Sequence, residues 1–461
     1  MGGGDYDGHK EHYWFFAPRG KGLKVLTDAG ADNIAHHKYK SGDSTVLDNY
    51  LSPNVWEPLT NSLPMWLAPN LITTIGFTFN LASYTLGAWY LNNAGSAATN
   101  DDDDGGGGVS SYEPVELPWW LFVFNGICVI IYYTLDCMDG KQARRTKSSS
   151  PLGQLFDHGM DCLSVLSFLQ TIQCMMELPP HLLLVLQNAL QFPFWVAQWE
   201  EYYTGSLPHS SGNIGVTETN YGLGMWSILT GILFGREMYD KVVYTIPTTT
   251  DHHLLANHNF IKWLIGGSTT TTAAAAAAAA SDVQVKHIMI VVYVFFTIVL
   301  IVFSWKRVYN HIMMTEDGGN VAMKLFASAM SKHLSPLLLT VTSMYGLVDS
   351  IMDAKTTNHP NAGGSLSLGL CFCLITIKLI VYSMARMAYA DIQYDVLPFV
   401  GIVLYTKFFV LVVDDDPSLL FQLLDLYYLA RLLYWTRKAC DQLCKRLNVQ
   451  LFRIPYDKKQ Q

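Results

Sequence analysis

One stretch of the sequence concentrates the side chains that could carry chemistry. It reads DCMDGKQARRTKSSSPLGQLFDHGMD and contains two pairs of aspartates, Asp136 with Asp139 and Asp157 with Asp161. Residues three or four apart lie on the same face of a helix, so each pair can present its carboxylates together. Four carboxylates at one point repel one another unless cations lie between them, and hard divalent cations are the usual solution. The stretch therefore predicts a metal site.

Two helices must bring the aspartate pairs together. The residues between the pairs include Ser148–Pro151, a turn-rich loop that lets the flanking helices run antiparallel. Both flanks are apolar enough to be membrane helices, so the acids lie at or near the membrane, where ionisable groups are costly and mark functional sites. The competing interpretation is a pair of solvated acidic helix ends without a metal.

The spacing D-x-x-D-G-x-x-A-R-x8-G-x3-D-x3-D resembles the motif of the CDP-alcohol phosphotransferase family. Its eight positions are filled by Asp136, Asp139, Gly140, Ala143, Arg144, Gly153, Asp157 and Asp161. The stretches DGKQARRT and SPLGQLFDHGMD, which include the residues between the motif positions, are similar to the sequences of the eukaryotic choline- and ethanolaminephosphotransferases. Stretches elsewhere that share this resemblance are WLAPNLIT (66–73), WEEYYTG (199–205), GVTE (215–218) and FRIPY (452–456).

Composition indicates a membrane protein. Half of the 461 residues are hydrophobic, only 15% are charged, and the mean hydropathy is positive. Much of the net charge of −8 lies in loops such as 101–104 and 414–416, so it indicates no nucleic-acid partner. The eight cysteines show neither zinc-site nor secreted-scaffold spacing, and we expect reduced thiols.

The apolar pattern predicts an all-α fold, a polytopic integral membrane protein with about ten transmembrane helices. Residues 1–62 form an expected cytoplasmic segment, in which His36–Ser52 is either an amphipathic surface helix or a solvated loop. Residues 63–436 form the transmembrane domain and 437–461 a cytoplasmic tail. The expected spans lie at about 70–92, 117–137, 152–174, 180–199, 221–235, 286–305, 334–352, 364–385, 395–413 and 419–436.

Charge asymmetry between the connections predicts the orientation. One set of connections carries most of the Lys and Arg residues, whereas loops 93–116 and 236–285 on the opposite side carry few. By the positive-inside rule, the aspartates and both chain ends face the cytoplasm and these two loops face the lumen. The loops contain low-complexity runs at 101–108 and 268–280, which we expect to be tolerated insertions without function.

The resemblance implies a phosphoryl transfer. The hydroxyl of diacylglycerol attacks the phosphoryl group next to the choline or ethanolamine of CDP-choline or CDP-ethanolamine, CMP leaves, and a phospholipid forms. Two Mg²⁺ or Mn²⁺ ions would neutralise the phosphate oxygens. On this basis Asp136, Asp139 and Asp157 hold the metals, and Asp161 completes the second metal site.

The alcohol nucleophile also needs a base, and the sequence offers two candidates. His158 directly follows Asp157, and an imidazole has a suitable intrinsic pKa for a base near neutral pH. Asp161 is the alternative, although a metal-bound carboxylate is a poorer proton acceptor. We expect His158 to be the base; a hydrogen-bonded helix histidine without a catalytic role is the competing interpretation.

Further residues are expected to bind the CDP part of the substrate. Gly140 and Gly153 allow close approach of the backbone to a phosphate, and Arg144 can contact phosphates bidentately. Asn70, in the WLAPNLIT stretch, matches a family position expected to touch the cytidine end; without the resemblance it would pass for a helix cap. Less specific candidates for nucleotide contacts are Lys141 and Gln142.

The cationic head group is expected to meet aromatic and acidic residues. Trp199, Glu200, Glu201 and Tyr202 lie together at the predicted cytoplasmic end of a span, and Glu218 follows the next loop. Aromatic faces with carboxylates suit an ammonium group. The alternative is an ordinary aromatic belt at the membrane interface.

The overall prediction is an enzyme of the endoplasmic reticulum or Golgi membrane that makes phosphatidylcholine or phosphatidylethanolamine, as a monomer or a homodimer. An inositol-phospholipid or inositolphosphoceramide-type synthase is an alternative in the same enzyme class. A cation transporter is an alternative from another class, but it would place acids at mid-membrane on several helices. The choice between choline and ethanolamine stays open.

Overall fold

The computed structural model describes residues 25–37, 44–97, 116–208, 210–211, 214–246, 281–316, 318–347, 364–410 and 417–454. Within these ranges the protein is mostly helical, as predicted. The all-α prediction needs one correction, because two small antiparallel sheets are also present. They pair β1 (Ser210–Ser211) with β2 (Ile214–Gly215) and β3 (Val242–Ile246) with β4 (Ser281–Gln284). Both predicted low-complexity runs lie outside the described residues.

Each of the ten apolar segments predicted from the sequence coincides with helical structure. Among the described residues, three helices, α5, α12 and α16, are long and apolar enough to cross a membrane. The ten helical segments are α4 (Pro69–Ala97), α5 (Trp119–Arg145), α6 (Pro151–Met176), α7 (Pro180–Thr204), α8 (Val216–Leu229) with η2 (Thr230–Phe234), α12 (Val285–Thr315), α14 (Leu334–Thr342) with η3 (Ser343–Leu347), α16 (Ser365–Ala385), α17 (Leu397–Tyr405) with η5 (Thr406–Val410), and α19 (Ser418–Leu447).

The N-terminal segment forms short helices before the first apolar one. Its elements are α1 (Asp28–Ala35), α2 (Val46–Leu51), η1 (Ser52–Trp56) and α3 (Glu57–Ser62). Thr45 starts α2 with a reciprocal capping box, because its hydroxyl accepts from the Asp48 N–H and the Asp48 carboxylate accepts from the Thr45 N–H. The predicted amphipathic stretch is therefore helical at 46–51, while residues 38–43 lie outside the described part.

Other elements were not predicted from the sequence. They are α9 (Glu237–Asp240), α13 (Gly319–Ser331) and η4 (Tyr394–Val396). Helix α13 packs on the end of α12, where the rings of Tyr309 and Phe326 meet edge to face at 5.2 Å between centroids. The last helix also runs further than predicted: α19 continues to Leu447 instead of ending at residue 436.

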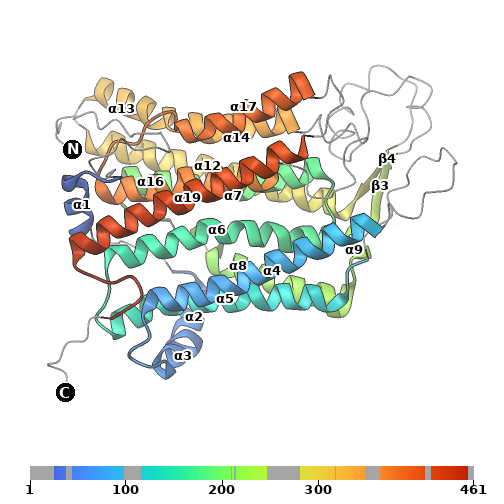
Figure 1. The fold of residues 1–461 in the computed structure, drawn as a ribbon, viewed down its shortest axis with the longest axis horizontal. Coiled ribbons are helices and arrows are strands. Elements are labelled where there is room, and N and C mark those ends of the chain that lie inside the picture. Colours follow the sequence, from blue (N-terminus) through green and yellow to red (C-terminus); the bar gives the residue numbers. More distant parts are fainter. Residues whose placement is uncertain are drawn as a thin grey trace.

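The long helices lie side by side, with α6 in the middle of the bundle (Figure 1). Helix α6 contacts α4 and α5 on one side and α7 and α16 on the other. Helix α16 forms the core of the bundle. The most apolar 18-residue stretch of α16 is 94% buried, whereas the most apolar 18-residue stretch of α12 is only 17% buried. Helix α1, the start of α6 and the end of α19 lie at one end of the bundle, opposite β3 and β4 (Figure 1).

Candidate metal centre

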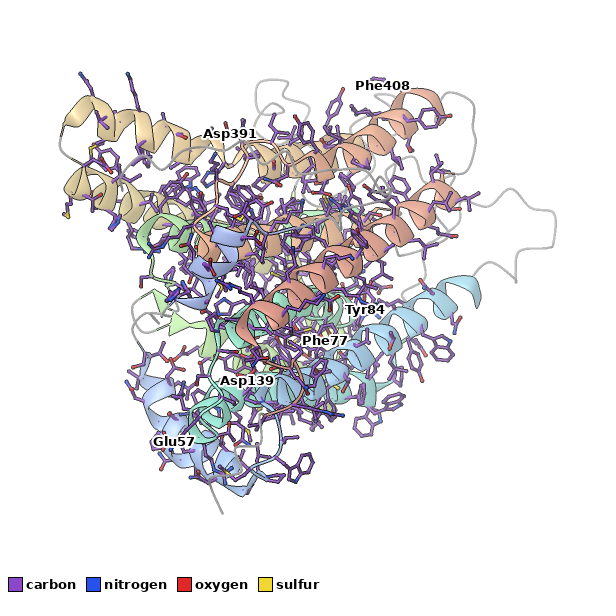
Figure 2. The ribbon with its side chains drawn as sticks, turned by 60° about the vertical axis from the view of Figure 1, so that its left-hand side comes forward. Glu57, Phe77, Tyr84, Asp139, Asp391 and Phe408 are labelled. Carbon is purple, nitrogen blue, oxygen red and sulfur yellow. The ribbon has the colours of Figure 1, made fainter. Side chains whose placement is uncertain are left out.

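Three of the four predicted aspartates converge in the structure. Asp136 and Asp139 come from the last turns of α5, and Asp157 from the second turn of α6. Each offers one carboxylate oxygen, and these oxygens all lie within 4.8 Å of one another. Figure 2 shows Asp139 inside the bundle, far from Phe408 at the opposite end. The antiparallel pair of helix ends predicted from the sequence thus gathers the carboxylates.

The turn between α5 and α6 explains how this arrangement forms. Lys147 adopts a left-handed conformation with φ of 54°, which reverses the chain directly after α5. Ser150 then caps α6, its hydroxyl accepting a hydrogen bond from the Gly153 N–H, and Pro151 occupies the first helical position. Residues with strong turn and cap preferences therefore set the register in which the aspartate pairs meet.

The three carboxylates meet without an ion-pair partner among the described residues. Asp139 is only 7% exposed. One oxygen each of Asp136 and Asp157 is buried and has no hydrogen-bond partner among the described residues. Over the same residues, no Lys, Arg or His forms an ion pair with them. Because buried polar atoms are nearly always satisfied, this all-oxygen set fits a hard divalent cation.

Asp161 lies beside this group rather than within it. It follows Asp157 by one turn of α6, and its Oδ1 accepts a hydrogen bond of 2.6 Å from the Tyr132 hydroxyl. Thr73, on α4, donates similarly to Asp139 Oδ2. Sequence reasoning missed both hydroxyl donors. The available signals were the four-residue spacing of Tyr132 from Asp136 and the place of Thr73 in the WLAPNLIT stretch.

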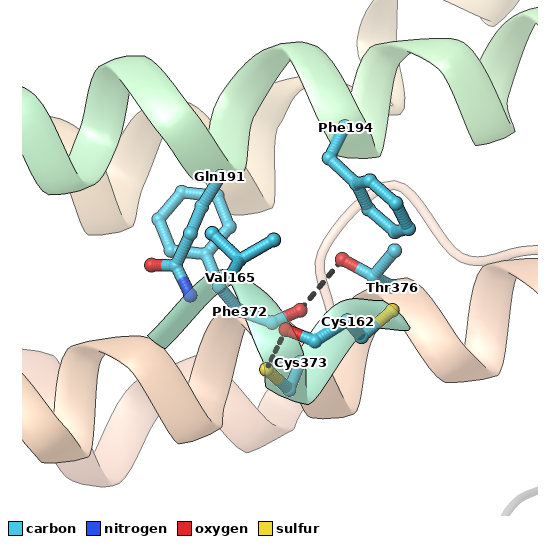
Figure 3. A pocket seen from close by; sticks show the side chains of 7 residues that line it. All are labelled: Cys162, Val165, Gln191, Phe194, Phe372, Cys373 and Thr376. Carbon is cyan, nitrogen blue, oxygen red and sulfur yellow. Dashed lines mark hydrogen bonds between the residues drawn. The ribbon is translucent and has the colours of Figure 1, made fainter. Parts of the chain in front are cut away.

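His158 is buried on α6, next to the acidic face of that helix. It precedes Cys162 by one helical turn, and Cys162 lines a crevice between α6, α7 and α16 (Figure 3). Helical geometry therefore puts His158 and Cys162 on one face of α6, next to the face that carries Asp157 and Asp161. The crevice walls are mainly apolar: Cys162, Val165, Gln191, Phe194, Phe372, Cys373 and Thr376. The polar groups of two of these residues are satisfied internally, because Thr376 donates to the Phe372 carbonyl and Cys373 to the Cys162 carbonyl.

Asn70 and Gly153 meet at the starts of α4 and α6. Asn70 Oδ1 lies 3.5 Å from the position that a Cβ would take at Gly153, so the glycine leaves space beside the carboxamide. The Asn70 amide donates to the Leu451 carbonyl at 2.8 Å. At the end of α5, a Cβ on Gly140 would lie 3.5 Å from the guanidinium of Arg144, which is itself exposed. Asn70, Gly153, Gly140 and Arg144 therefore lie on α4, α5 and α6 close in sequence to Thr73 and the aspartates.

Lys141 and Gln142 point away from the aspartates, which departs from their expected nucleotide role. The Lys141 ammonium donates to Ser52 Oγ at 2.6 Å and pairs with Glu57 at 3.3 Å. Gln142 is fully buried, and its amide donates to the carbonyls of Pro64 and Leu67. Both residues hold the N-terminal segment against α5.

Arg145 completes this attachment. Its guanidinium donates to the carbonyls of Thr60, Asn61 and Leu63, where α3 ends. A cation at a helix C-terminus satisfies carbonyls that lack partners within the helix. Its neighbour Arg144 instead lines a surface cleft beside the N-terminal segment, together with Glu57, Thr60, Asn61, Lys141 and Arg145.

The residues predicted to bind the head group are engaged in separate contacts. Trp199 is fully buried, and its indole donates to the Ala329 carbonyl at 2.9 Å. Glu200 forms a two-point ion pair with Arg307 of α12, at 2.5 and 2.8 Å. The remaining contacts are Tyr202 Oη to the Met387 carbonyl, and Glu218 to the Gly215 N–H at the start of α8. The structure therefore does not gather Trp199, Glu200, Tyr202 and Glu218 around one ligand.

Comparison with known proteins agrees with the motif. Residues 66–198 match the family model described as CDP-alcohol phosphatidyltransferase. The chain is 26% identical to Cholinephosphotransferase 1 of Xenopus laevis, over 91% of this chain and 89% of that protein. It is 35% identical to Ethanolaminephosphotransferase 1 of Homo sapiens over 37% and 41% of the two chains, and 33% identical to Choline/ethanolaminephosphotransferase 2 of Arabidopsis thaliana over 39% and 41%. Residues 66–198 thus match a CDP-alcohol phosphatidyltransferase domain, and the relatives of the chain include proteins named as choline- and ethanolaminephosphotransferases.

Proposed function

We propose that this chain transfers phosphocholine or phosphoethanolamine from CDP-choline or CDP-ethanolamine to diacylglycerol. The lipid hydroxyl oxygen forms a bond to the phosphorus next to the alcohol head group, the bond from that phosphorus to CMP breaks, and CMP leaves with the electron pair. The observation that carries this proposal is the meeting of Asp136, Asp139 and Asp157 within one family motif. The names of the relatives support the two head groups.

We assign Mg²⁺ or Mn²⁺ binding to this cluster, with Asp136, Asp139 and Asp157 as ligands and Asp161 completing a second ion site. When bound, such ions neutralise phosphate oxygens and favour departure of CMP. Tyr132 and Thr73 hold the carboxylates of Asp161 and Asp139 in fixed orientations through their hydroxyl groups.

His158 accepts the proton of the lipid hydroxyl in this proposal. It lies one helical turn before Cys162, which lines the apolar crevice of α6, α7 and α16 shown in Figure 3, so an acceptor lipid on that side of α6 reaches it at the edge of the site. Asp161 is a weaker candidate because it already accepts a hydrogen bond from Tyr132. Substitution of His158 by Ala should abolish turnover and leave nucleotide binding intact.

The nucleotide subsite that we propose consists of residues beside the acidic cluster. Arg144 contacts the phosphates, and the backbone at Gly140 and Gly153 admits them closely. Asn70 contacts the cytidine end, since its carboxamide lies beside Gly153. We leave Lys141, Gln142 and the residues at the end of α7 out of this subsite, because their polar groups bind other parts of the chain.

The proposed setting is a membrane of the endoplasmic reticulum or Golgi, with about ten spans and the aspartates facing the cytoplasm. Three strongly apolar helices and the family support a membrane location. The acidic cluster lies at the same end of the bundle as the basic ends of α5 and α19 (Figure 1), which supports the cytoplasmic side.

An assay of the full chain purified in detergent tests the function. Diacylglycerol is supplied with CDP-choline or CDP-ethanolamine, and CMP release is followed with Mg²⁺, with Mn²⁺ or with EDTA. We expect metal-dependent release of CMP that EDTA abolishes and added metal restores. Undiminished synthesis in EDTA would refute the metal assignment, and a lack of CMP release with both CDP-alcohols would refute the reaction.

A further inference from the structure

The segment that follows α19 folds back onto the bundle. Asn448 ends the helix in a left-handed conformation with φ of 52°, which Asn tolerates better than most residues. Gln450 and Arg453 then pair as an isolated antiparallel bridge, so residues 450–453 form a tight turn. In Figure 1 the chain after α19 runs down the end of the bundle where α4 and α6 begin.

Two contacts fix this turn against the starts of α4 and α6. The Leu451 carbonyl accepts the hydrogen bond of 2.8 Å from the Asn70 amide, across 381 residues of sequence. The ring of Phe452 packs edge to face on that of Phe156, with 5.7 Å between centroids and 87° between planes. Phe452 nevertheless stays 45% exposed, so part of its ring is free to contact another molecule.

The same two helix ends adjoin the acidic cluster of α5 and α6. On α4, Thr73 follows Asn70 by three residues and donates to Asp139. On α6, Phe156 directly precedes Asp157, and Gly153 lies one turn before it, beside Asn70. The turn is therefore anchored within one helical turn of the residues that hold the phosphate end of the proposed substrate.

We infer that the turn Gln450–Arg453 forms one wall of the nucleotide subsite, with the Phe452 ring stacking on the cytosine ring and the Leu451 carbonyl orienting the Asn70 carboxamide. This inference rests on the proposed function and extends it to residues outside the matched domain. Stacking on an aromatic side chain tolerates any base, whereas a carboxamide held by one hydrogen bond presents its other atoms in a fixed direction. Phe452 thus supplies affinity, and Asn70 supplies orientation.

The test is a titration of the full-length protein with CMP in the presence of Mn²⁺, together with turnover of CDP-choline. We compare Phe452→Ala, Phe452→Tyr and the control Phe408→Ala, which removes an exposed ring at the other end of the molecule (Figure 2). Loss of a stacked ring should weaken CMP binding about ten-fold in Phe452→Ala. The KM for the CDP-alcohol should rise in parallel, while the KM for diacylglycerol stays unchanged. Phe452→Tyr and Phe408→Ala should keep the affinity of the natural chain.

Two results would overturn the inference and leave the function standing. One is an unchanged CMP affinity in Phe452→Ala. The other is a lower unfolding temperature of that variant without any loss of affinity, which would show that Phe452 only packs on Phe156. If instead the natural chain neither binds CMP nor turns over a CDP-alcohol, the proposed function fails and the inference fails with it.

Discussion

Two buried charge clusters in this protein have opposite character. In the first, Asp395 of η4 accepts hydrogen bonds from Lys378 of α16 at 2.6 Å and from Arg431 of α19 at 3.0 Å. Its backbone carbonyl also accepts from the Tyr428 hydroxyl at 2.7 Å. In the second, the acidic cluster of α5 and α6, carboxylate oxygens are buried without a partner among the described residues.

The difference separates charges that serve the fold from charges that serve a ligand. A buried carboxylate is tolerated when donors surround it, and it is strongly unfavourable when its neighbours are also carboxylates. The Asp395 cluster is complete without any other molecule and joins three elements. The acidic cluster has carboxylate oxygens without such donors among the described residues, and its arrangement could hold a metal ion. Removal of one member should therefore affect stability in the first cluster and activity in the second.

The largest expected effect is on stability, from Asp395→Ala. This change leaves the charges of Lys378 and Arg431 buried without an anion, and breaking a buried pair in this way costs about 3–5 kcal/mol. Denaturant unfolding of the purified protein measures the loss. The fraction that stays folded should still release CMP with metal. An unfolding free energy equal to that of the natural chain would contradict the structural role of Asp395.

The second effect is on activity, from Asp139→Asn. Mutation of a residue that hydrogen-bonds to a metal ligand typically lowers activity about 10–100-fold. Loss of a ligand itself should therefore lower the rate of CMP release at least about 100-fold. Stability should be unchanged or higher, because one of several mutually repelling carboxylates is removed. If Asp139→Asn is inactive only because it is unfolded, Asp139 would serve stability in the same way as Asp395, and the difference between the two clusters would be refuted.

A smaller effect is expected from Tyr132→Phe, which removes the hydroxyl bound to Asp161 and keeps the ring. Activity should fall about 10-fold, and a higher concentration of Mn²⁺ should be needed for half-maximal activation, since outer partners of metal ligands orient them. Tyr90→Phe is the matched control, because the ring of Tyr90 packs in an apolar cluster with Leu91 and against the rings of Trp89 and Trp120. Equal metal activation of both variants would show that Tyr132 does not position Asp161.

The smallest effect is expected from Lys141→Ala. Glu57, its ion-pair partner, is 55% exposed, and such pairs contribute at most about 1 kcal/mol. The KM for the CDP-alcohol should change less than about two-fold, because the structure directs this side chain to the N-terminal segment. A rise of the KM by ten-fold or more would return Lys141 to the nucleotide subsite.

The helices and the acidic cluster could be predicted because both follow local rules. Apolar runs of membrane length marked ten helical segments, and a spacing of three or four residues placed Asp136 with Asp139 on one face. Helix α13 was missed because it mixes exposed apolar residues with Lys324 and is too short to span a membrane. The end of α19 was missed because its basic residues resemble a tail, although the helix continues through them.

The residues predicted to bind the head group make separate contacts for a geometric reason. Trp199, Glu200 and Tyr202 are close in sequence, but successive residues of a helix point about 100° apart. Glu200 therefore meets Arg307 on α12, while Trp199 and Tyr202 meet other segments. Spacing shows which residues share a helix face, but it does not show which neighbour covers that face. The role of Tyr132 was also missed. Tyr132 is a polar residue within an apolar run, and its position in the sequence does not show that its hydroxyl meets Asp161.

The hydrogen bond between Asn70 and Leu451 has a consequence for biosynthesis. A ribosome makes the aspartates at residues 136–161 long before it makes Leu451, so the acidic cluster can form while most of the chain is still missing. A premature stop after α19 would yield a protein with its helices in place and one side of the Asn70 carboxamide uncovered. This contact is therefore made only after synthesis has passed Leu451, and shorter chains lack it.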